Sequence, residues 1–425
     1  MRLALAVAAI GLTIIATSPL SAALRPAAGA AKAAPASAAA EGEWPCWLGP
    51  NHDGKSTETG LLKEWPAEGP KLLWKVADIG HGYSSATVSG GMVYITGDTD
   101  DQKLVIFAFD LSGAPKWKQV HDAAWTKSQP GARASCTIDG GNLYLESGNG
   151  AVGCYDAKTG APKWKRDMKE FGGKPGGWGY AESVLIHGAG AFITPGGKNA
   201  IVALDKNTGK NVWASTGFSA GAHYSSCIPV TFNNVPLIIN GTGDGLVCID
   251  GRNGALVWMN DFSAKNTANC PTPAYSDGYV FWSNGYGKGG ICMKMSAAGG
   301  KVTATEAWRT ADMVCHHGGY IIDNGYIYGD NGGGVTCLEL STGKVMWKDR
   351  AVGKGSLCWA DGMLYLLSES GGRGALASYS PQGMQIKGKV TVQGTGPSWA
   401  HPVVAGGRLY LRYDTNLYCF DVKGK

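Results

Sequence analysis

Short apolar runs alternate with glycine- or asparagine-led turns along most of this chain. Eight runs rich in aromatic and β-branched residues each follow such a turn: GGMVYITG, GGNLYLES, GAGAFITP, NNVPLIIN, DGYVFWSN, NGYIYGDN, DGMLYLLS and GGRLYLRY. A second set of eight short runs comes after them, ending at or near FAFD, GCYD, VALD, VCID, CMKM, CLEL, ASYS and YCFD. This composition between turn residues is typical of β-strands. The pattern therefore predicts an all-β chain of hairpin-connected strands.

A tryptophan repeat gives the period of this organisation. A turn of the form D-x-x-x-G-x-x-x-W recurs, sometimes incompletely, and Val390 stands where an eighth tryptophan is expected. The repeat tryptophans are Trp74, Trp117, Trp164, Trp213, Trp258, Trp308 and Trp347. Their spacing, about 45 residues, is that of a four-stranded propeller blade. We therefore expect a single β-propeller of eight four-stranded antiparallel blades, with the Asp capping each turn and the Trp packing between neighbouring sheets.

The two ends of the repeat are complementary. The last unit ends at YCFDVKGK without a fourth strand, whereas the first tryptophan strand, KLLWKV, lacks the three strands that should precede it. The N-terminal strand is therefore expected to complete the C-terminal blade and close the ring, which removes exposed sheet edges. The predicted propeller covers residues 72–425, after an N-terminal extension over residues 43–71.

The first residues have the features of an export signal. Arg2 precedes an apolar run of about 15 residues, shorter than the ~20 that span a membrane. Ser21 and Ala23 match the small-residue rule for cleavage, which predicts a signal peptide over 1–23 and an Ala/Pro-rich tether over 24–42. We expect an exported, periplasmic or extracellular monomer that is soluble after cleavage and has no transmembrane segment in its mature chain.

Composition narrows the classes of function. Glycine contributes 65 of 425 residues without a G-x-y period, which excludes collagen, and 44% of residues are hydrophobic, which excludes general disorder. The net charge of +5 comes without a long basic run, so no nucleic-acid partner is expected. The strings GTGDG and GYGKGG are followed by predicted strands, whereas a nucleotide-binding loop requires a helix.

The eleven cysteines fall into two groups. Five of them lie two residues before the strand-ending Asp or its equivalent, where other units have Ala or Ser: Cys154, Cys248, Cys292, Cys337 and Cys419. We interpret these as compact hydrophobic residues. The positions of the others, Cys46, Cys136, Cys227, Cys270, Cys315 and Cys358, follow no such rule. Of these, Cys270 and Cys315 lie in neighbouring units and are the one pair proposed as a disulfide; no C-x-x-C zinc pattern is present.

The repeat motif resembles that of the PQQ-like (pyrroloquinoline-quinone-type) β-propeller proteins. This superfamily includes quinoprotein alcohol dehydrogenases and the lipoprotein propeller of the outer-membrane protein assembly machine. A narrower exported bacterial subfamily is similar over nearly all of residues 43–425, in WPCWLGPNHDGKSTETGLLKEWP, GGWGYAES, NTANCPTP, HHGG and SWAHPVVAGGRLYLR. For the dehydrogenases the resemblance implies PQQ with calcium, two adjacent cysteines, and Glu and Asn ligands after second strands. This chain has no Cys-Cys pair and no C-x-x-C-H haem motif, and the calcium set cannot be placed.

The candidate functional residues lie just before the first strand of each unit, where a propeller presents side chains to the mouth of its central channel. Aligned on the first unit, they are His81, Tyr83, Arg133, Tyr180, Glu182, His223, Tyr224, Asn269, Cys270, His316, His317, Lys354, Trp399 and His401. An ordinary hydrated channel is one interpretation. A small-molecule or polysaccharide site is another, with Tyr83, Tyr224 and Trp399 stacking on a ligand that Arg133, Lys354 and Glu182 orient.

A third interpretation is a transition-metal site built from His223, His317 and His401. If a reaction occurs, Glu182 and His317 are the candidate bases. Two functions follow for the chain as a whole. It is either a binding module whose channel face takes a small molecule, a carbohydrate or a periplasmic or outer-membrane protein, or a PQQ-dependent dehydrogenase that oxidises an alcohol or sugar.

Overall fold

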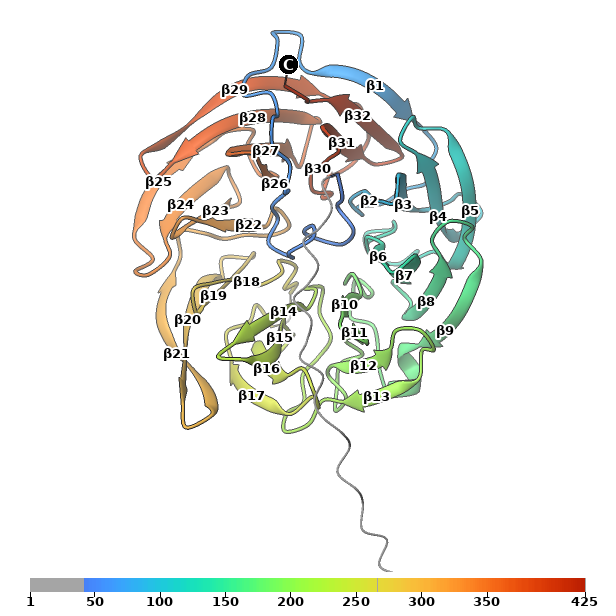
Figure 1. Ribbon diagram of the computed structural model, residues 1–425. Coiled ribbons are helices and arrows are strands. Elements are labelled where there is room, and N and C mark those ends of the chain that lie inside the picture. Colours follow the sequence, from blue (N-terminus) through green and yellow to red (C-terminus); the bar gives the residue numbers. More distant parts are fainter. Residues whose placement is uncertain (1–41, 266, 425) are drawn as a thin grey trace, which may run out of the picture. The chain divides into compact units, whose positions relative to one another are not determined.

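Eight four-stranded antiparallel sheets form a ring in the computed structural model, which describes residues 42–265 and 267–424 (Figure 1). The described residues form one compact unit. The eight-bladed propeller predicted from the tryptophan spacing is thereby confirmed. The predicted signal peptide and all but the last residue of the tether lie outside the described residues. Among those described, no helix is sufficiently long and apolar to cross a membrane.

Each blade runs from an inner strand at the channel to an outer strand at the rim. Blade 1 contains β2 (Thr87–Ser89), β3 (Met92–Asp98), β4 (Lys103–Asp110) and β5 (Pro115–Ala123). Blade 2 contains β6 (Thr137–Asp139), β7 (Asn142–Glu146), β8 (Ala151–Asp156) and β9 (Pro162–Asp167), followed by the short 3₁₀ helix η1 (Met168–Phe171). Blade 3 contains β10 (Leu185–His187), β11 (Gly190–Ile193), β12 (Val202–Asp205) and β13 (Asn211–Ala214). Blade 4 contains β14 (Ile228–Phe232), β15 (Val235–Gly241), β16 (Leu246–Asp250) and β17 (Leu256–Asn260).

The second half of the ring repeats this order. Blade 5 contains β18 (Ala274–Ser276), β19 (Tyr279–Asn284), β20 (Gly289–Ala298) and β21 (Lys301–Thr310). Blade 6 contains β22 (Tyr320–Asp323), β23 (Tyr326–Asp330), β24 (Val335–Glu339) and β25 (Val345–Asp349). Blade 7 contains β26 (Gly355–Ala360), β27 (Met363–Ser368), β28 (Arg373–Ser380) and β29 (Gly383–Thr391). Blade 8 contains β30 (Val403–Ala405), β31 (Arg408–Tyr413), β32 (Asn416–Asp421) and, as its outer strand, β1 (Lys71–Val76).

Ring closure occurs through this last blade. Strand β1 pairs antiparallel with β32, from Lys71 opposite Asp421 to Val76 opposite Leu417. The first tryptophan strand therefore supplies the fourth strand that the C-terminal unit lacks, as predicted. Closure in this way ties the two ends of the propeller together and pairs the edge of β32.

The repeat tryptophans lock each blade to the next. The indole of Trp117 in blade 1 donates a hydrogen bond to the Ala157 carbonyl of blade 2 (3.2 Å). It also covers the turn glycine Gly160, where an added Cβ would lie 2.6 Å from the ring. The same turn is capped by Asp156, whose carboxylate accepts hydrogen bonds from the Thr159 amide and hydroxyl, both at 2.9 Å. Most repeat tryptophans are consequently half-buried between sheets.

Blade 7 is the unit whose tryptophan is missing from the repeat. A residue of the N-terminal extension, Trp65, packs there against the Tyr365 ring of β27 at 6.0 Å. That separation matches the 5.9 Å between Tyr94 and Trp117 in blade 1. Trp65 also donates its amide hydrogen to the Lys387 carbonyl. An extension residue thus compensates for the degenerate copy of the repeat.

The cysteines at the repeated position lie inside the blades. Each is buried and faces the repeat tryptophan on the neighbouring outer strand of its own sheet, as Cys154 faces Trp164. This arrangement explains why the position requires a small apolar side chain. The disulfide proposed between Cys270 and Cys315 is wrong, because all eleven cysteines are free thiols.

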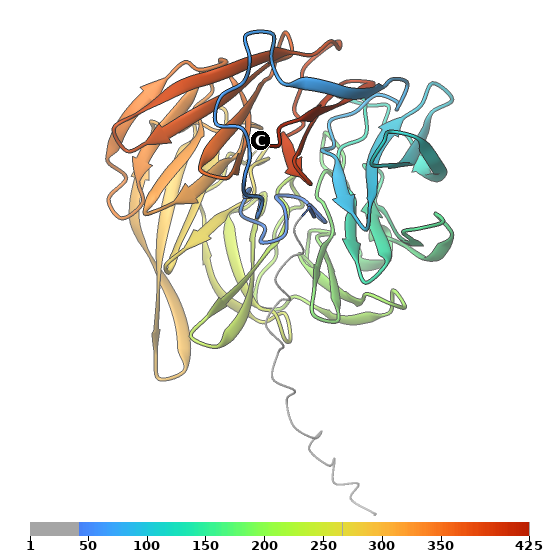
Figure 2. The same cartoon turned by 45° about the horizontal axis from the view of Figure 1, so that its top comes forward.

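The N-terminal extension crosses the end of the channel at which the inner strands finish (Figures 1 and 2). Trp44 forms a β-bridge with Val88 at the end of β2, and Lys55 forms another with Trp359 near the end of β26. Between these anchors, Trp47 donates its indole hydrogen to the Thr272 hydroxyl (2.9 Å). The extension therefore closes one end of the channel and leaves the opposite mouth as the candidate site.

Candidate functional site

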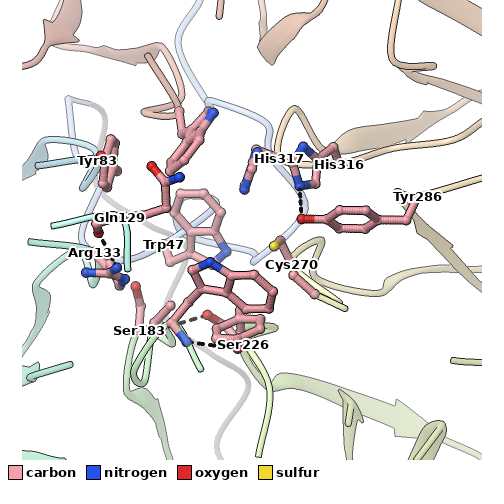
Figure 3. Close-up of a pocket in the computed structure, with 15 residues that line it drawn as sticks. Trp47, Tyr83, Gln129, Arg133, Ser183, Ser226, Cys270, Tyr286, His316 and His317 are labelled. Carbon is pink, nitrogen blue, oxygen red and sulfur yellow. Dashed lines mark hydrogen bonds between the residues drawn. The ribbon is translucent and has the colours of Figure 1, made fainter. Parts of the chain in front are cut away.

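A cavity of about 260 Å³ lies at the channel mouth, built from the loops that precede the inner strands. Six aromatic residues line it, namely Trp47, Tyr83, Trp178, Tyr224, Tyr286 and Trp399. Its polar lining includes Gln129, Arg133, Cys270, His316 and His317. Figure 3 shows these side chains converging from several blades, with Trp47 of the extension between them. The cavity lies at the channel mouth, where the sequence pattern predicts the candidate residues.

The aromatic wall is a continuous row of ring contacts on one side. The Trp399 ring lies 4.4 Å from the Tyr83 ring and 4.2 Å from the His317 ring, the latter nearly parallel at 22°. Across the cavity, Trp178 and Tyr224 form an edge-on pair at 5.9 Å. Such flat apolar surfaces stack on planar groups and on the apolar faces of sugar rings.

Arg133 is the unpaired charge of the cavity. Its guanidinium donates to the carbonyls of Gly131 (2.6 Å), Ser128 (3.1 Å) and Gln129 and lies over the Trp125 ring. No carboxylate lies within 4.0 Å of it in residues 42–265 and 267–424. Burial lowers the pKa of Arg133, yet a guanidinium stays charged at neutral pH. An anionic group in the cavity would compensate this charge.

Two histidines and a thiol form the opposite corner. Candidate ligand atoms of Cys270, His316 and His317 all lie within 4.8 Å of one another. The Tyr286 hydroxyl is 3.0 Å from Nε2 of His316, and the Lys354 ammonium is 2.9 Å from its Nδ1. Burial is the main cause that lowers the pKa of His316 to about 4, and Lys354 adds to it. Both rings are therefore neutral at pH 7, because burial also lowers the pKa of His317 well below its ordinary value.

Several predicted site residues lie outside the cavity lining. Glu182 is buried, although its neighbours Ala181 and Ser183 do line the cavity. Burial and the nearby Glu146 raise the pKa of Glu182 well above its usual value. The sequence predicts that Glu182 orients a ligand, but its carboxyl does not line the cavity.

The remaining candidates also lie outside the cavity lining. Asn269 is buried, and its amide nitrogen lies 2.8 Å from Nδ1 of His223. His401 lies with its Nε2 2.9 Å from the His317 carbonyl. Lys354 forms an ion pair with Glu369 (2.7 Å) as well as its contact with His316. Tyr180 is buried and donates to the Pro195 carbonyl, and the side chain of His81 is half exposed beside Asp414.

The predicted metal set of His223, His317 and His401 does not come together. Within the described parts of the chain, the one group of three candidate ligands consists of Cys270, His316 and His317. The sequence alignment had all three residues in its ring, but the predicted set took its histidines from alternate blades. His316 and Cys270 meet because they precede the inner strands of adjacent blades.

Eight lining residues were missed by the sequence reasoning, and the four largest of them are Trp47, Gln129, Trp178 and Tyr286. Trp47 comes from the extension, and Tyr286 follows the second strand of blade 5, so an alignment of first strands could not include them. Trp47 and Trp178 nevertheless had a signal, because they are tryptophans outside the repeat position in the strings WPCWLGP and GGWGY.

The lining does not fit calcium-bound PQQ. Calcium requires several oxygen ligands, with carboxylates prominent among them. The residues that line the cavity include no Asp and no Glu. The adjacent cysteine pair implied by the dehydrogenase resemblance is absent from the sequence as well.

The fold and sequence define a PQQ-like propeller related to both assembly-factor and quinoprotein propellers. More specifically, the chain belongs to the family described as "Outer membrane protein assembly factor BamB", whose model matches residues 102–349. An outer membrane protein assembly factor BamB of Shewanella oneidensis is 24% identical over 217 residues, covering 50% of this chain and 52% of that protein. A polyvinylalcohol dehydrogenase of a Pseudomonas species is 25% identical over 254 residues, covering 52% of this chain and 35% of that protein. The matches thus span about half and a third of these relatives.

Solved structures show the same fold. BamB from Moraxella catarrhalis superposes with a TM-score of 0.61 and 15% identity, covering 83% of this chain and 98% of that one. The quinohemoprotein alcohol dehydrogenase ADHIIG from Pseudomonas putida HK5 gives a TM-score of 0.59 and 12% identity, covering 90% and 81%. At these identities the likeness concerns the propeller alone.

Proposed function

We propose that this chain is an exported binding module whose channel cavity takes a small carbohydrate bearing a carboxylate. The observation that carries the proposal is the unpaired Arg133 beside an aromatic wall in a cavity that Trp47 closes. The predicted signal peptide supports a location outside the cytoplasm. The channel face is then the functional surface, and the repeat is its scaffold.

The size and lining of the cavity support a ligand of one or two sugar rings. Its volume of about 260 Å³ lies just below the ~300–1,000 Å³ of sites for drug-sized molecules. Trp399 and Tyr83 offer a stacked face on one side, and Gln129 offers amide hydrogen-bonding groups. A sugar ring has an apolar face for the aromatic residues and hydroxyls for the polar ones.

Electrostatics favours an acidic sugar over a neutral one. Arg133 is half-buried, so solvent screens its charge less than that of a fully exposed arginine. A carboxylate can accept charge-assisted hydrogen bonds from the guanidinium N–H groups that the Ser128, Gln129 and Gly131 carbonyls leave free, and such bonds are stronger than neutral ones. Arg133 would therefore supply selectivity, whereas the rings supply contact area.

The proposal is tested by titrating D-glucuronate and D-galacturonate into the protein and following tryptophan fluorescence and heat. We expect at least one uronate to bind, with the matching neutral sugar at least tenfold weaker. Arg133→Gln should lose a similar factor, about 1.4 kcal/mol or more. Arg252→Gln is the matched control, because this exposed arginine pairs with Asp250 on a turn between outer strands. Equal binding by wild type and Arg133→Gln, or no uronate binding, would overturn the proposal.

A protein partner is the second candidate, because the family description names outer-membrane protein assembly. In that case the loops around the channel mouth would serve as the docking face, and a free uronate would not bind. For the PQQ-dependent alternative, PQQ and calcium are added and dye-linked alcohol oxidation is followed. We expect no turnover, since no carboxylate lines the cavity; turnover would make the dehydrogenase function correct.

A further inference from the structure

Cys270, His316 and His317 form a compact set of metal-ligand types in one wall of the cavity. Cys270 precedes β18 and the two histidines precede β22, the inner strands of adjacent blades. Ligand atoms of the three lie within 4.8 Å of one another. In a tetrahedral zinc site, ligand atoms are roughly 3.5 Å apart. Side-chain rotations that move these ligand atoms by roughly 1 Å would therefore bring all three onto one ion.

His317 provides an independent indication of a missing partner. Its Nδ1 is buried and makes no hydrogen bond in the described structure. Buried polar atoms are nearly always paired, so an unpaired ring nitrogen requires an explanation. The ring is held between the parallel face of Trp399 and the neighbouring His316 ring, 3.7 Å away. An imidazole fixed in this way is preorganised as a ligand.

Cys270 is also the accessible thiol of the protein. It is the one cysteine that is not buried; the other ten lie in the interior. All three side chains line the cavity, so an ion could enter from the channel mouth (Figure 3). The other cysteines offer no comparable group of histidines among the described residues.

We propose that Cys270, His316 and His317 bind one first-row transition metal ion of the zinc and copper class. One thiolate and two imidazoles suit these ions, which prefer sulfur and nitrogen donors. On binding, the Cys270 thiol releases its proton to solvent and the metal–sulfur bond forms, with no change in oxidation state. Three protein ligands leave a fourth position that faces the cavity.

Lys354 acts as the competitor of the metal. Its ammonium lies 2.9 Å from Nδ1 of His316. The contact occupies the lone pair of this nitrogen and keeps a positive charge beside the site. Binding of a cation requires this contact to break, and Lys354 then retains its ion pair with Glu369. Removing the ammonium should consequently tighten metal binding, an effect that a purely structural role of the histidines would not produce.

The test uses untagged, reduced full-length protein titrated with Co²⁺, followed by Zn²⁺. We expect one equivalent of Co²⁺ to give a thiolate-to-cobalt charge-transfer band, which Zn²⁺ then removes. Cys270→Ser should abolish the band, His317→Gln should weaken binding at least tenfold, and Lys354→Met should strengthen it. His81→Gln is the control, since this half-exposed histidine lies on the same face beside Asp414 and should change nothing.

Wild type without the band, or Cys270→Ser with an unchanged band, would overturn the metal site. Circular dichroism of each variant distinguishes loss of ligands from loss of fold. The experiment contains no sugar, so its outcome is separate from that of the uronate titration. Arg133→Gln is expected to keep the cobalt band while losing glucuronate, which distinguishes failure of one proposal from failure of the other.

Discussion

At the residue scale, the least expected feature is a pair of buried carboxyls. Glu146 and Glu182 are both inside the molecule, and neither carboxylate oxygen of Glu146 has a hydrogen-bonding partner among the described residues. Burial raises the pKa of each well above its ordinary value, and Glu146 contributes further to the shift of Glu182. The folded protein therefore holds protons here that the unfolded chain releases above about pH 4.3.

This difference in bound protons predicts that Glu182→Gln stabilises the folded protein by an amount that depends on pH. Because the folded state binds more protons than the unfolded state above about pH 4.3, the contribution of Glu182 to stability falls as the pH rises. The variant should exceed wild type in free energy of unfolding by about 1 kcal/mol or more at pH 8, and by less at pH 5. Urea titrations at both pH values measure this. The exposed Glu64→Gln serves as control; a gain that does not grow with pH would contradict the assignment.

At the element scale, the contact between a repeat tryptophan and the next blade explains the glycine of the turn. Gly160 has φ +75° and lies against Trp117, and Gly209 has φ +68° and lies against Trp164 in the same way. The glycine thus meets two demands, a left-handed backbone and the absence of a Cβ beneath an indole. The turn and the inter-blade contact are one structural device.

Two alanine substitutions in blade 2 separate these demands. Gly141→Ala, at φ +77° with no atom within 4 Å of the new Cβ, should cost about 1–2 kcal/mol of unfolding free energy. Gly160→Ala should cost at least about 1 kcal/mol more, because its Cβ would overlap the Trp117 ring. Denaturant midpoints compare the two variants. Equal losses would mean that the tryptophan contact does not require the glycine.

At the scale of the whole molecule, the repeat predicted the ring and its closure, but not what fills its centre. Blade number, strand order and the role of β1 follow from the regular spacing of similar units along the chain. Trp47 and Trp65 belong to the extension, outside the period, so their positions depend on how that segment crosses the assembled blades. Glu182 belongs to an aligned position but is buried. Alignment alone does not specify whether a side chain faces the channel or the interior.

The same reasoning explains the error in the metal set. His223, His317 and His401 occupy similar positions in different blades, and equal height in a ring does not give lateral distance. The residues that do meet, Cys270 with His316 and His317, come from adjacent blades. Chain order already puts His223, His317 and His401 in alternate blades, so a metal set had to be sought between adjacent blades.

A crystal structure of the protein soaked with the uronate that binds best in solution would locate the ligand. We expect the sugar ring in the channel cavity, against the Trp399 and Tyr83 wall, with its carboxylate on the Arg133 guanidinium. A sugar bound at the outer rim of the blades, or one in the cavity with its carboxylate turned away from Arg133, would rule out the proposed site.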